Sequence, residues 1–176
     1  MRRGVRIGVD VGSVRVGVAR CDAEGLLATP IATLARGPKD VAEIAALVVE
    51  EEAVEVVVGL PLHLSGKEGA ASGSARAYAQ ELAERIAPIE VRLVDERLST
   101  VGAARELRDA GIDARRGRML RDQAAAVIIL QSALDLERST GHPPGEPVVV
   151  HRAGVDVPAV DDTGVDDTGV EGGSEA

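Results

Sequence analysis

Aromatic side chains are almost absent from this chain of 176 residues, which contains one Tyr and neither Phe nor Trp. A hydrophobic core must therefore consist of Val, Leu, Ile and Ala. Apolar residues make up 45% of the chain, and this length and composition are sufficient for one globular domain. The shortage of aromatics also means that base stacking contributes little to any contact with nucleic acid.

Cysteine and histidine are scarce as well. Cys21 is the only cysteine, which excludes an intramolecular disulfide and a thiolate metal site. We interpret it as a small residue that is buried or ends a strand, in a protein of the reducing cytoplasm. The histidines His63, His142 and His151 are scattered along the chain. They predict neither a zinc site nor the base of a serine hydrolase.

Long apolar runs are missing too. No run of about 20 apolar residues occurs, so no transmembrane helix is predicted. Near the N-terminus, Arg6, Asp10 and Arg15 interrupt the apolar region that a secretory signal needs. We therefore expect a cytoplasmic protein that does not contact membranes.

The net charge of −9 comes mainly from the C-terminal end. Residues 153–176 contain seven acidic residues and no Lys or Arg, which leaves 22 of the 29 acidic residues against 20 basic ones elsewhere. A nearly neutral body does not exclude a polyanionic partner, because local patches decide that question. The tandem repeat "VDDTGVDDTGV" is low in complexity. We predict a globular domain over residues 1–139 and an acidic, mostly disordered tail over residues 140–176.

Apolar periodicity predicts the element order βββαβαβαα, which is typical of an α/β domain with a mixed sheet. Residues 63–74 and 112–120 have the composition of loops, and the second of these is basic. The predicted strands cover residues 6–12, 14–20, 26–34, 54–62 and 89–95, and the predicted helices cover residues 40–52, 75–86, 100–110 and 121–137.

Asp10 is a carboxylate within an apolar strand. A buried acid is costly unless it is paired or binds a metal. Its neighbours on the same side of the predicted hairpin are small, namely Gly8, Gly12, Gly17 and Ala19. We interpret them as an open face on which a metal or a phosphate backbone approaches Asp10. The alternative is a structural Asp whose hydrogen bonds hold a turn.

Two further acids stand at the ends of elements. Glu96 follows the predicted strand over residues 89–95, and ligand sites in α/β sheets lie beyond the carboxyl ends of strands. Its alternative is a solvated charged loop. Asp122 opens the last predicted helix on the same face as Ala126, so it faces the protein. Its alternative is a favourable position at a helix N-terminus, which stabilises by about 1 kcal/mol.

Three carboxylates from a strand, a strand end and a helix start are suited to hard cations such as Mg²⁺ or Mn²⁺. Two such ions about 4 Å apart activate water for phosphodiester hydrolysis. Arginine side chains near these acids predict contacts with phosphates. The alternatives are an ion pair of Arg97 with an acid and, for the basic loop, a solvated turn. The candidate nucleic-acid contacts are Arg15, Arg97, Arg115, Arg116, Arg118 and Arg121.

Four segments, in this order, resemble the YqgF family of RuvC-like proteins. They are "GVDVGSVRVGVA" (8–19), "GLPLHLSGKEG" (59–69), "VDERLST" (94–100) and "DQAAAVIILQSALD" (122–135). Together they span about residues 4–138 and leave the acidic tail outside. The resemblance implies a ribonuclease H-like mixed sheet, in which three antiparallel N-terminal strands are followed by two parallel strands and helices flank the sheet.

The resemblance also implies a catalytic and metal-binding role for Asp10, Glu96 and Asp122, with two Mg²⁺ or Mn²⁺ ions. Two departures stand out. His63 and Ser65 replace an expected Asn and an expected acid or amide in the second segment. In RuvC the last helix carries acids three residues apart, whereas position 125 is Ala here, so a fourth carboxylate ligand is absent or comes from elsewhere.

Members of this family are described as pre-16S rRNA nucleases or as Holliday junction resolvases. We therefore expect a metal-dependent endonuclease that processes the 5′ end of precursor 16S rRNA, with a ribosomal precursor particle as a partner. The alternative enzyme is a resolvase of four-way DNA junctions. A resolvase is expected to act as a homodimer, because two symmetric strands are cut.

Two functions outside the nucleases also remain open. "IGVDVGS" also resembles the phosphate-binding hairpin of actin-like and sugar-kinase ATPases. Those proteins enclose ATP between two such domains, and this chain has room for only one. A nucleic-acid-binding module without catalysis is the other reading, in which Asp10→Asn leaves function intact.

Overall fold

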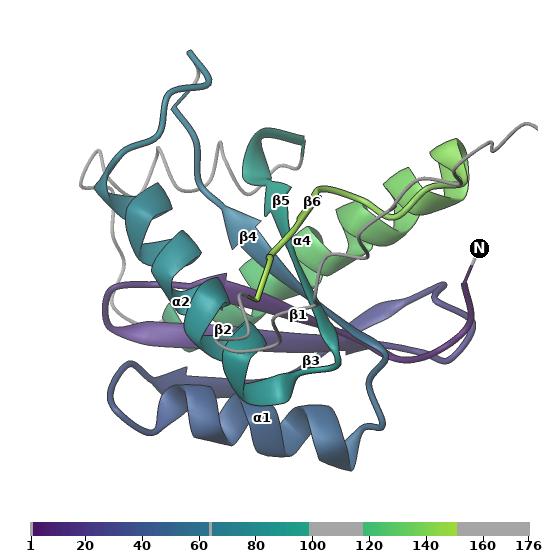
Figure 1. Ribbon diagram of the computed structural model, residues 1–176, viewed down its shortest axis with the longest axis horizontal. Coiled ribbons are helices and arrows are strands. Elements are labelled where there is room, and N and C mark those ends of the chain that lie inside the picture. The colour runs from purple at the N-terminus through teal and green to yellow at the C-terminus, as the bar shows by residue number, and fades with distance from the viewer. Residues whose placement is uncertain (1, 64, 99–117, 151–176) are drawn as a thin grey trace, which may run out of the picture.

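The computed structural model describes residues 2–63, 65–98 and 118–150, without the side chains of Leu98 and of residues 118–123. One mixed sheet forms its centre, in the strand order β3-β2-β1-β4-β5-β6 (Figure 1). The fold class predicted from the sequence is confirmed. The strands are β1 (Arg6–Val11), β2 (Arg15–Cys21), β3 (Ala28–Ala35), β4 (Glu55–Leu60), β5 (Glu90–Asp95) and the short β6 (Glu146–Pro147).

The first three strands form an antiparallel meander, as their short connections require. β1 pairs with β2 in a register that sets Asp10 opposite Gly17, and the Gly12 N–H closes the turn by donating to the Arg15 carbonyl. β4 and β5 then add parallel to β1, because each is reached through a helical crossover. The carboxyl ends of β1, β4 and β5 therefore lie at one edge of the sheet.

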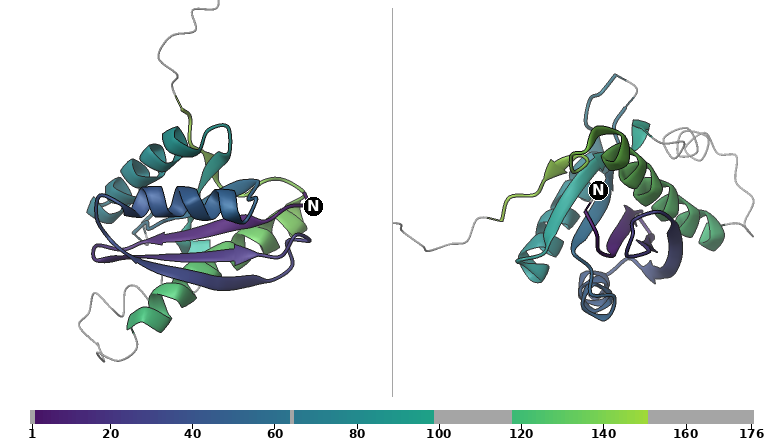
Figure 2. Two further views of the ribbon diagram at one scale, coloured as in Figure 1. Left: turned by 90° about the horizontal axis from the view of Figure 1, so that it is seen from below. Right: turned by 90° about the vertical axis from the view of Figure 1, so that its right-hand side faces the viewer.

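Helices cover both faces of this sheet (Figure 2). α1 (Asp40–Glu50) and α2 (Ala70–Ile86) pack on one face, over inward residues such as Ile7 and Val9. α4 (Arg118–Thr140) packs on the other face, over Val57 and Val94. Both cores are aliphatic, as the composition requires. None of the described helices is sufficiently long and apolar to cross a bilayer.

The one tyrosine of the chain belongs to the first of these cores. Tyr78 of α2 is only 1% exposed. The Arg36 guanidinium lies 4.3 Å from the centre of its ring and also binds Asp40 at the start of α1. Burial raises the pKa of the Tyr78 hydroxyl, and the nearby Asp40 carboxylate adds to the rise. The tyrosine therefore stays neutral and joins both helices to the β3–α1 connection.

Several predicted element boundaries differ from the structure by two or more residues, and one predicted helix lies outside the described residues. α2 begins at Ala70 rather than at residue 75, because Gly69 is extended and its N–H donates to the Ser72 hydroxyl at 3.2 Å. The predicted loop thus shrinks to a hairpin in which Leu62 bridges to Glu68. α4 begins at Arg118 rather than at residue 121. The predicted helix over residues 100–110 lies outside the described residues.

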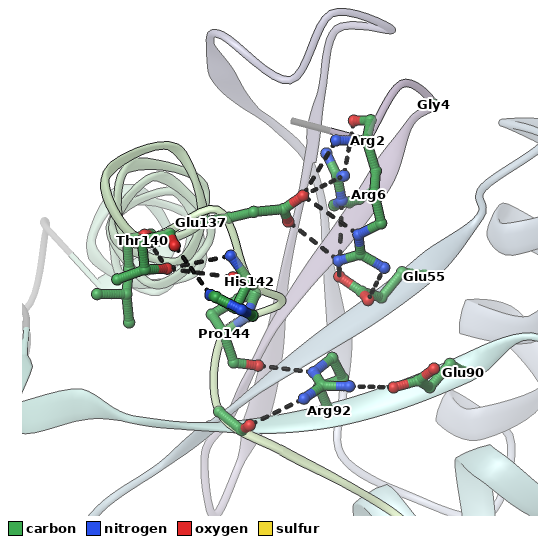
Figure 3. A network of polar contacts seen from close by, with 12 residues as sticks. Arg2, Gly4, Arg6, Glu55, Glu90, Arg92, Glu137, Thr140, His142 and Pro144 are labelled. Atoms are coloured by element: carbon green, nitrogen blue, oxygen red, sulfur yellow. Dashed lines mark hydrogen bonds and ion pairs between the residues drawn. The ribbon is translucent and has the colours of Figure 1, made fainter.

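A buried ionic cluster joins the N-terminus, the starts of β1 and β4, and the second half of α4 (Figure 3). Glu137 accepts hydrogen bonds from Arg2 at 3.0 Å and from Arg6 at 3.3 Å. Glu55 accepts from Arg2 at 2.8 Å and lies 3.6 Å from Arg6. Arg6, Glu55 and Glu137 are all buried. Burial alone would raise the pKa of Glu137, but the two arginines hold it below its ordinary value.

Residues 141–150 follow α4 and run along the outer edge of β5. The Arg92 guanidinium donates to the carbonyls of Pro144 and Gly145, and the Val148 N–H donates to Val91. Gly145 has a φ of +67°, and any side chain there would collide with the Leu93 carbonyl. This segment covers an edge that would otherwise present unpaired backbone groups. The tail predicted over residues 140–176 therefore begins with a segment that pairs with the sheet, and its remaining residues, 151–176, lie outside the described residues.

Candidate active site

Two buried carboxylates lie at the edge where the parallel strands end. Asp10 is the fifth residue of β1, and Glu96 follows β5 and opens the short helix η1 (Glu96–Leu98). Each residue is only 2% exposed. Carboxylates are rarely buried so completely without a compensating charge or a bound cation.

Gly59 of β4 separates the strands that carry these two acids. Val9 pairs with Val58, so Asp10 and Gly59 come next on neighbouring strands, and Gly59 itself pairs with Val94. A Cβ atom on Gly59 would lie only 2.6 Å from Glu96 Oε1. Glu96 therefore occupies the space above β4 that Gly59 leaves free, and it reaches from β5 toward the strand of Asp10.

The face of small residues around Asp10 is covered by α4. A Cβ atom on Gly8 would lie 2.6 Å from Leu130 Cβ and 3.0 Å from the Ala126 carbonyl oxygen. The expectation that Gly8 leaves the strand open to a phosphate backbone is therefore wrong. Its missing side chain instead lets the helix backbone approach the sheet closely, so the site is walled by α4 on this face.

α4 runs antiparallel to β1 and brings its own N-terminal end to the site. Glu137 binds Arg6 at the start of β1, and Leu130 packs on Gly8 two residues further along that strand. Asp122 lies one helical turn before Ala126, so its backbone belongs to the end of the helix that points toward Asp10. The Asp122 side chain lies outside the described part of the chain.

The donor set fits a hard divalent cation. Asp10 and Glu96 offer only anionic oxygen acceptors, which Mg²⁺ and Mn²⁺ prefer. Among the residues whose side chains are described, no three His, Cys, Asp or Glu residues gather as a metal site. The third member of the predicted triad, Asp122, falls outside that set. The triad therefore remains a prediction, with two of its members brought together by the sheet.

The predicted arginines are distributed unevenly around this edge. Arg15 opens β2 beside the β1–β2 turn, at the same end of the sheet as Asp10. Arg97 follows Glu96 directly. Arg118 and Arg121 belong to the first turn of α4, but their side chains are not described. Arg115 and Arg116 lie outside the described residues.

Arg97 pairs with the neighbouring acid Asp95. The Asp95 carboxylate accepts from Arg97 Nε at 3.0 Å and from Nη2 at 2.6 Å. The hydrogen bonds from Arg97 hold the pKa of Asp95 below its ordinary value. The sequence "DER" is consistent with this ion pair, because the side chain of an arginine at a strand end can reach an acid two residues earlier.

The space beside Glu96, between the end of β5 and α4, is too small to hold a water molecule. Its lining residues are Val94, Asp95, Glu96, Ile129 and Ser132.

Comparison with known proteins gives consistent matches. Residues 4–136 match the model of a family described as "RuvX: Holliday junction resolvase". The chain is 55% identical over 153 residues to a protein of Thermobifida fusca named "Putative pre-16S rRNA nuclease", with 83% of this chain and 96% of the other covered. It is 54% identical over 152 residues to a protein of the same name from Streptomyces coelicolor, with 85% and 91% covered.

Among solved structures, the chain is similar to RuvC of Thermus thermophilus in complex with a Holliday junction substrate. The TM-score is 0.54 with 19% identity, and the match covers 80% of this chain and 99% of the other. At this level of identity the similarity concerns the fold alone. It supports the ribonuclease H-like arrangement of the sheet.

Proposed function

This chain belongs to the RuvX family, and from that premise we propose that it is a metal-dependent endonuclease that processes the 5′ end of precursor 16S rRNA. The observation that carries the proposal is the pair of buried acids, Asp10 and Glu96, on either side of Gly59. The names of the relatives that are about 55% identical favour the rRNA substrate.

The proposed reaction is hydrolysis of a backbone P–O bond. Asp10, Glu96 and Asp122 would hold one or two Mg²⁺ or Mn²⁺ ions. Such ions supply Lewis-acid chemistry, because they acidify a water molecule and stabilise charge on the phosphate. The residues of α4 over Gly8 and Gly59 close one face of the site, and this keeps bulk water from that side of the carboxylates.

Arginines at the same edge would bind the backbone on either side of the cut. Arg15 and Arg97 are the described members of this set, and Arg115, Arg116, Arg118 and Arg121 complete it. Binding through phosphates alone carries no base information, so the shape of the RNA and its particle would select the position of the cut. An enzyme of this kind would act in the cytoplasm on a ribosomal precursor particle.

The second candidate function is the resolution of four-way DNA junctions. The description of the matching family favours it, and a junction resolvase would require a homodimer. The ATPase reading has less support, because the described sheet forms one domain and those enzymes enclose ATP between two.

One assay separates these functions. Wild type and Asp10→Asn are incubated with Mg²⁺ or Mn²⁺, once with a precursor 16S rRNA carrying its 5′ leader and once with a four-way DNA junction. Cleavage of the RNA by wild type alone is the expected result. Paired symmetric nicks in the junction would replace the first proposal by the second. Cleavage of neither substrate by folded, metal-loaded protein would contradict both.

A further inference from the structure

Arg97 is held in one orientation although it lies at the surface. Asp95 engages the Nε–Nη2 edge of the guanidinium, and its Oδ1 also accepts the Arg97 backbone N–H at 2.9 Å. The Arg97 side chain is 37% exposed and the Asp95 side chain is 21% exposed. The guanidinium is therefore fixed by a fork of hydrogen bonds and is still accessible to a ligand.

The turn between Leu62 and Glu68, described at residues 62–63 and 65–68, approaches the other edge of the same guanidinium. Gly66 has a φ of +79°, which favours glycine, and a Cβ atom there would lie 3.2 Å from Arg97 Nη1. Two hydrogen bonds close the described part of this turn: the Gly66 N–H donates to the His63 carbonyl at 2.7 Å, and the His63 N–H donates to the Lys67 carbonyl at 3.0 Å. No side chain at Gly66 therefore stands between the turn and Nη1.

We propose that Asp95, Arg97 and Gly66 form a subsite for one backbone phosphate of the nucleic acid, next to the carboxylate Glu96. Asp95 is a positioning residue in this subsite. It takes the Nε–Nη2 edge of Arg97, so that the donors on Nη1 face the space beside Gly66 and bind a phosphate oxygen. The proposal rests on the proposed function, because it assigns the phosphate to the nucleic acid that is cut.

Because Asp95 is negatively charged, the direction in which its removal changes the RNA affinity tests the proposal. A carboxylate close to a polyanion repels it, so its removal alone should tighten binding. If Asp95 orients Arg97, its removal should weaken binding, because Arg97 then has to be ordered when the ligand arrives. The two effects have opposite directions, and the proposal requires the second to be larger.

The experiment measures binding of a fluorescently labelled precursor 16S rRNA leader by anisotropy, at several KCl concentrations and with Ca²⁺ in place of Mg²⁺. The proteins are wild type, Asp95→Asn, Arg97→Gln and the double variant. Asp135→Asn is the matched control, because it breaks an exposed Asp–Arg pair with Arg138 on the distant half of α4. Thermal melting of each protein checks that the fold is kept.

We expect Arg97→Gln to weaken binding about tenfold and to lower the salt slope by about one. Asp95→Asn should weaken binding about threefold, and the double variant should bind like Arg97→Gln alone, because Asp95 acts through Arg97. Asp135→Asn should bind like wild type or slightly better. Tighter binding by Asp95→Asn, or independent effects of the two substitutions, would overturn the proposal.

The same proteins distinguish this subsite from the nuclease function. If wild type binds and cuts the RNA while Arg97→Gln binds with unchanged affinity and salt slope, the proposed subsite is wrong and the proposed nuclease function is kept. If wild type neither binds nor cuts the RNA, both proposals are contradicted.

Discussion

Glu96 reaches over Gly59, and its Oε1 atom lies only 2.6 Å from the position that a Cβ atom on that glycine would take. The carboxylate comes from the end of β5 and the glycine from the middle strand of the parallel set, so the two residues connect neighbouring strands at the carboxyl edge of the sheet. A change at Gly59 therefore acts on the position of Glu96 without altering any acid.

We expect Gly59→Ala to reduce cleavage at least tenfold and to destabilise the fold by about 1–3 kcal/mol, because the new methyl group displaces Glu96 and Ile129. Gly73→Ala in α2 is the control. Nothing lies within 4 Å of its Cβ position, and Gly to Ala in a helix stabilises by up to about 1 kcal/mol. Parallel urea unfolding and cleavage assays measure both effects. Full activity of Gly59→Ala would show that Glu96 has room to move.

The carboxylates themselves should be dispensable for folding. Asp10→Asn, Glu96→Gln and Asp122→Asn should each lower the cleavage rate at least a hundredfold. In metal-free buffer the first two should melt at the same temperature as wild type or higher, because each removes one of two like charges at the same edge of the sheet. Differential scanning calorimetry in EDTA provides the comparison. A large loss of stability would assign Asp10 or Glu96 a structural role instead.

The element order and the mixed sheet were predictable because they follow from local pattern, whereas the two parallel strands were implied only by the family resemblance. Alternating Ile7, Val9 and Val11 indicated one buried face, and the continuous apolar run at residues 54–62 indicated a strand covered on both sides. The same pattern could not say what covers the second face. Gly8 was for that reason interpreted as an opening for a ligand, although Leu130, far along the chain, packs against it.

The ionic cluster was not predictable from local pattern, because its members are far apart in sequence. Arg6 and Glu55 each open a strand, and Glu137 lies near the end of a helix, so each alone has the pattern of a surface charge. Only the pairing of β1 with β4, and the direction of α4 across them, brings these charges together. Boundaries such as the start of α2 were missed for a smaller reason, since Gly69 and Ser72 give no strong cap signal.

Glu137 should contribute strongly to stability. Glu137→Ala leaves the buried Arg6 without one of its two carboxylates, and such a change typically costs about 3–5 kcal/mol. Asp135→Ala, two residues earlier on the same helix, removes an exposed ion pair and should cost at most about 1 kcal/mol. Urea unfolding measures both variants. Similar losses for the two would mean that the cluster is less rigid than its hydrogen bonds indicate.

The same carboxylate should make stability depend on pH. Arg2 and Arg6 hold the pKa of Glu137 below its ordinary value of 4.5, despite its burial. Its contribution is therefore complete above pH 4.5 and is lost as the pH falls below that value, because the unfolded chain binds the proton first. The midpoint of urea unfolding, followed from pH 7 to pH 3, should fall more steeply for wild type than for Glu137→Gln. Parallel curves would exclude Glu137 as the source.

The position of a C-terminal truncation should matter. A chain that ends after Val150 keeps β6 and the contacts of Val148 and Val150 with the core, and it should fold and cleave like the full chain. A chain that ends after Thr140 uncovers the edge of β5 and should aggregate or melt several degrees lower. Light scattering and thermal melting distinguish the two. Equal behaviour would show that residues 141–150 add nothing to the fold.

The lone tyrosine has a practical consequence for all such unfolding experiments. Tyr78 is the only intrinsic fluorophore of the chain, and it is packed between α2 and the guanidinium of Arg36. Its emission therefore reports on the layer of α1 and α2, whereas the layer of α4, which walls the carboxylates, is optically silent. A tryptophan placed on α4 would give that second layer a fluorescence signal of its own. Comparing tyrosine and tryptophan emission would then show whether both faces of the sheet unfold together.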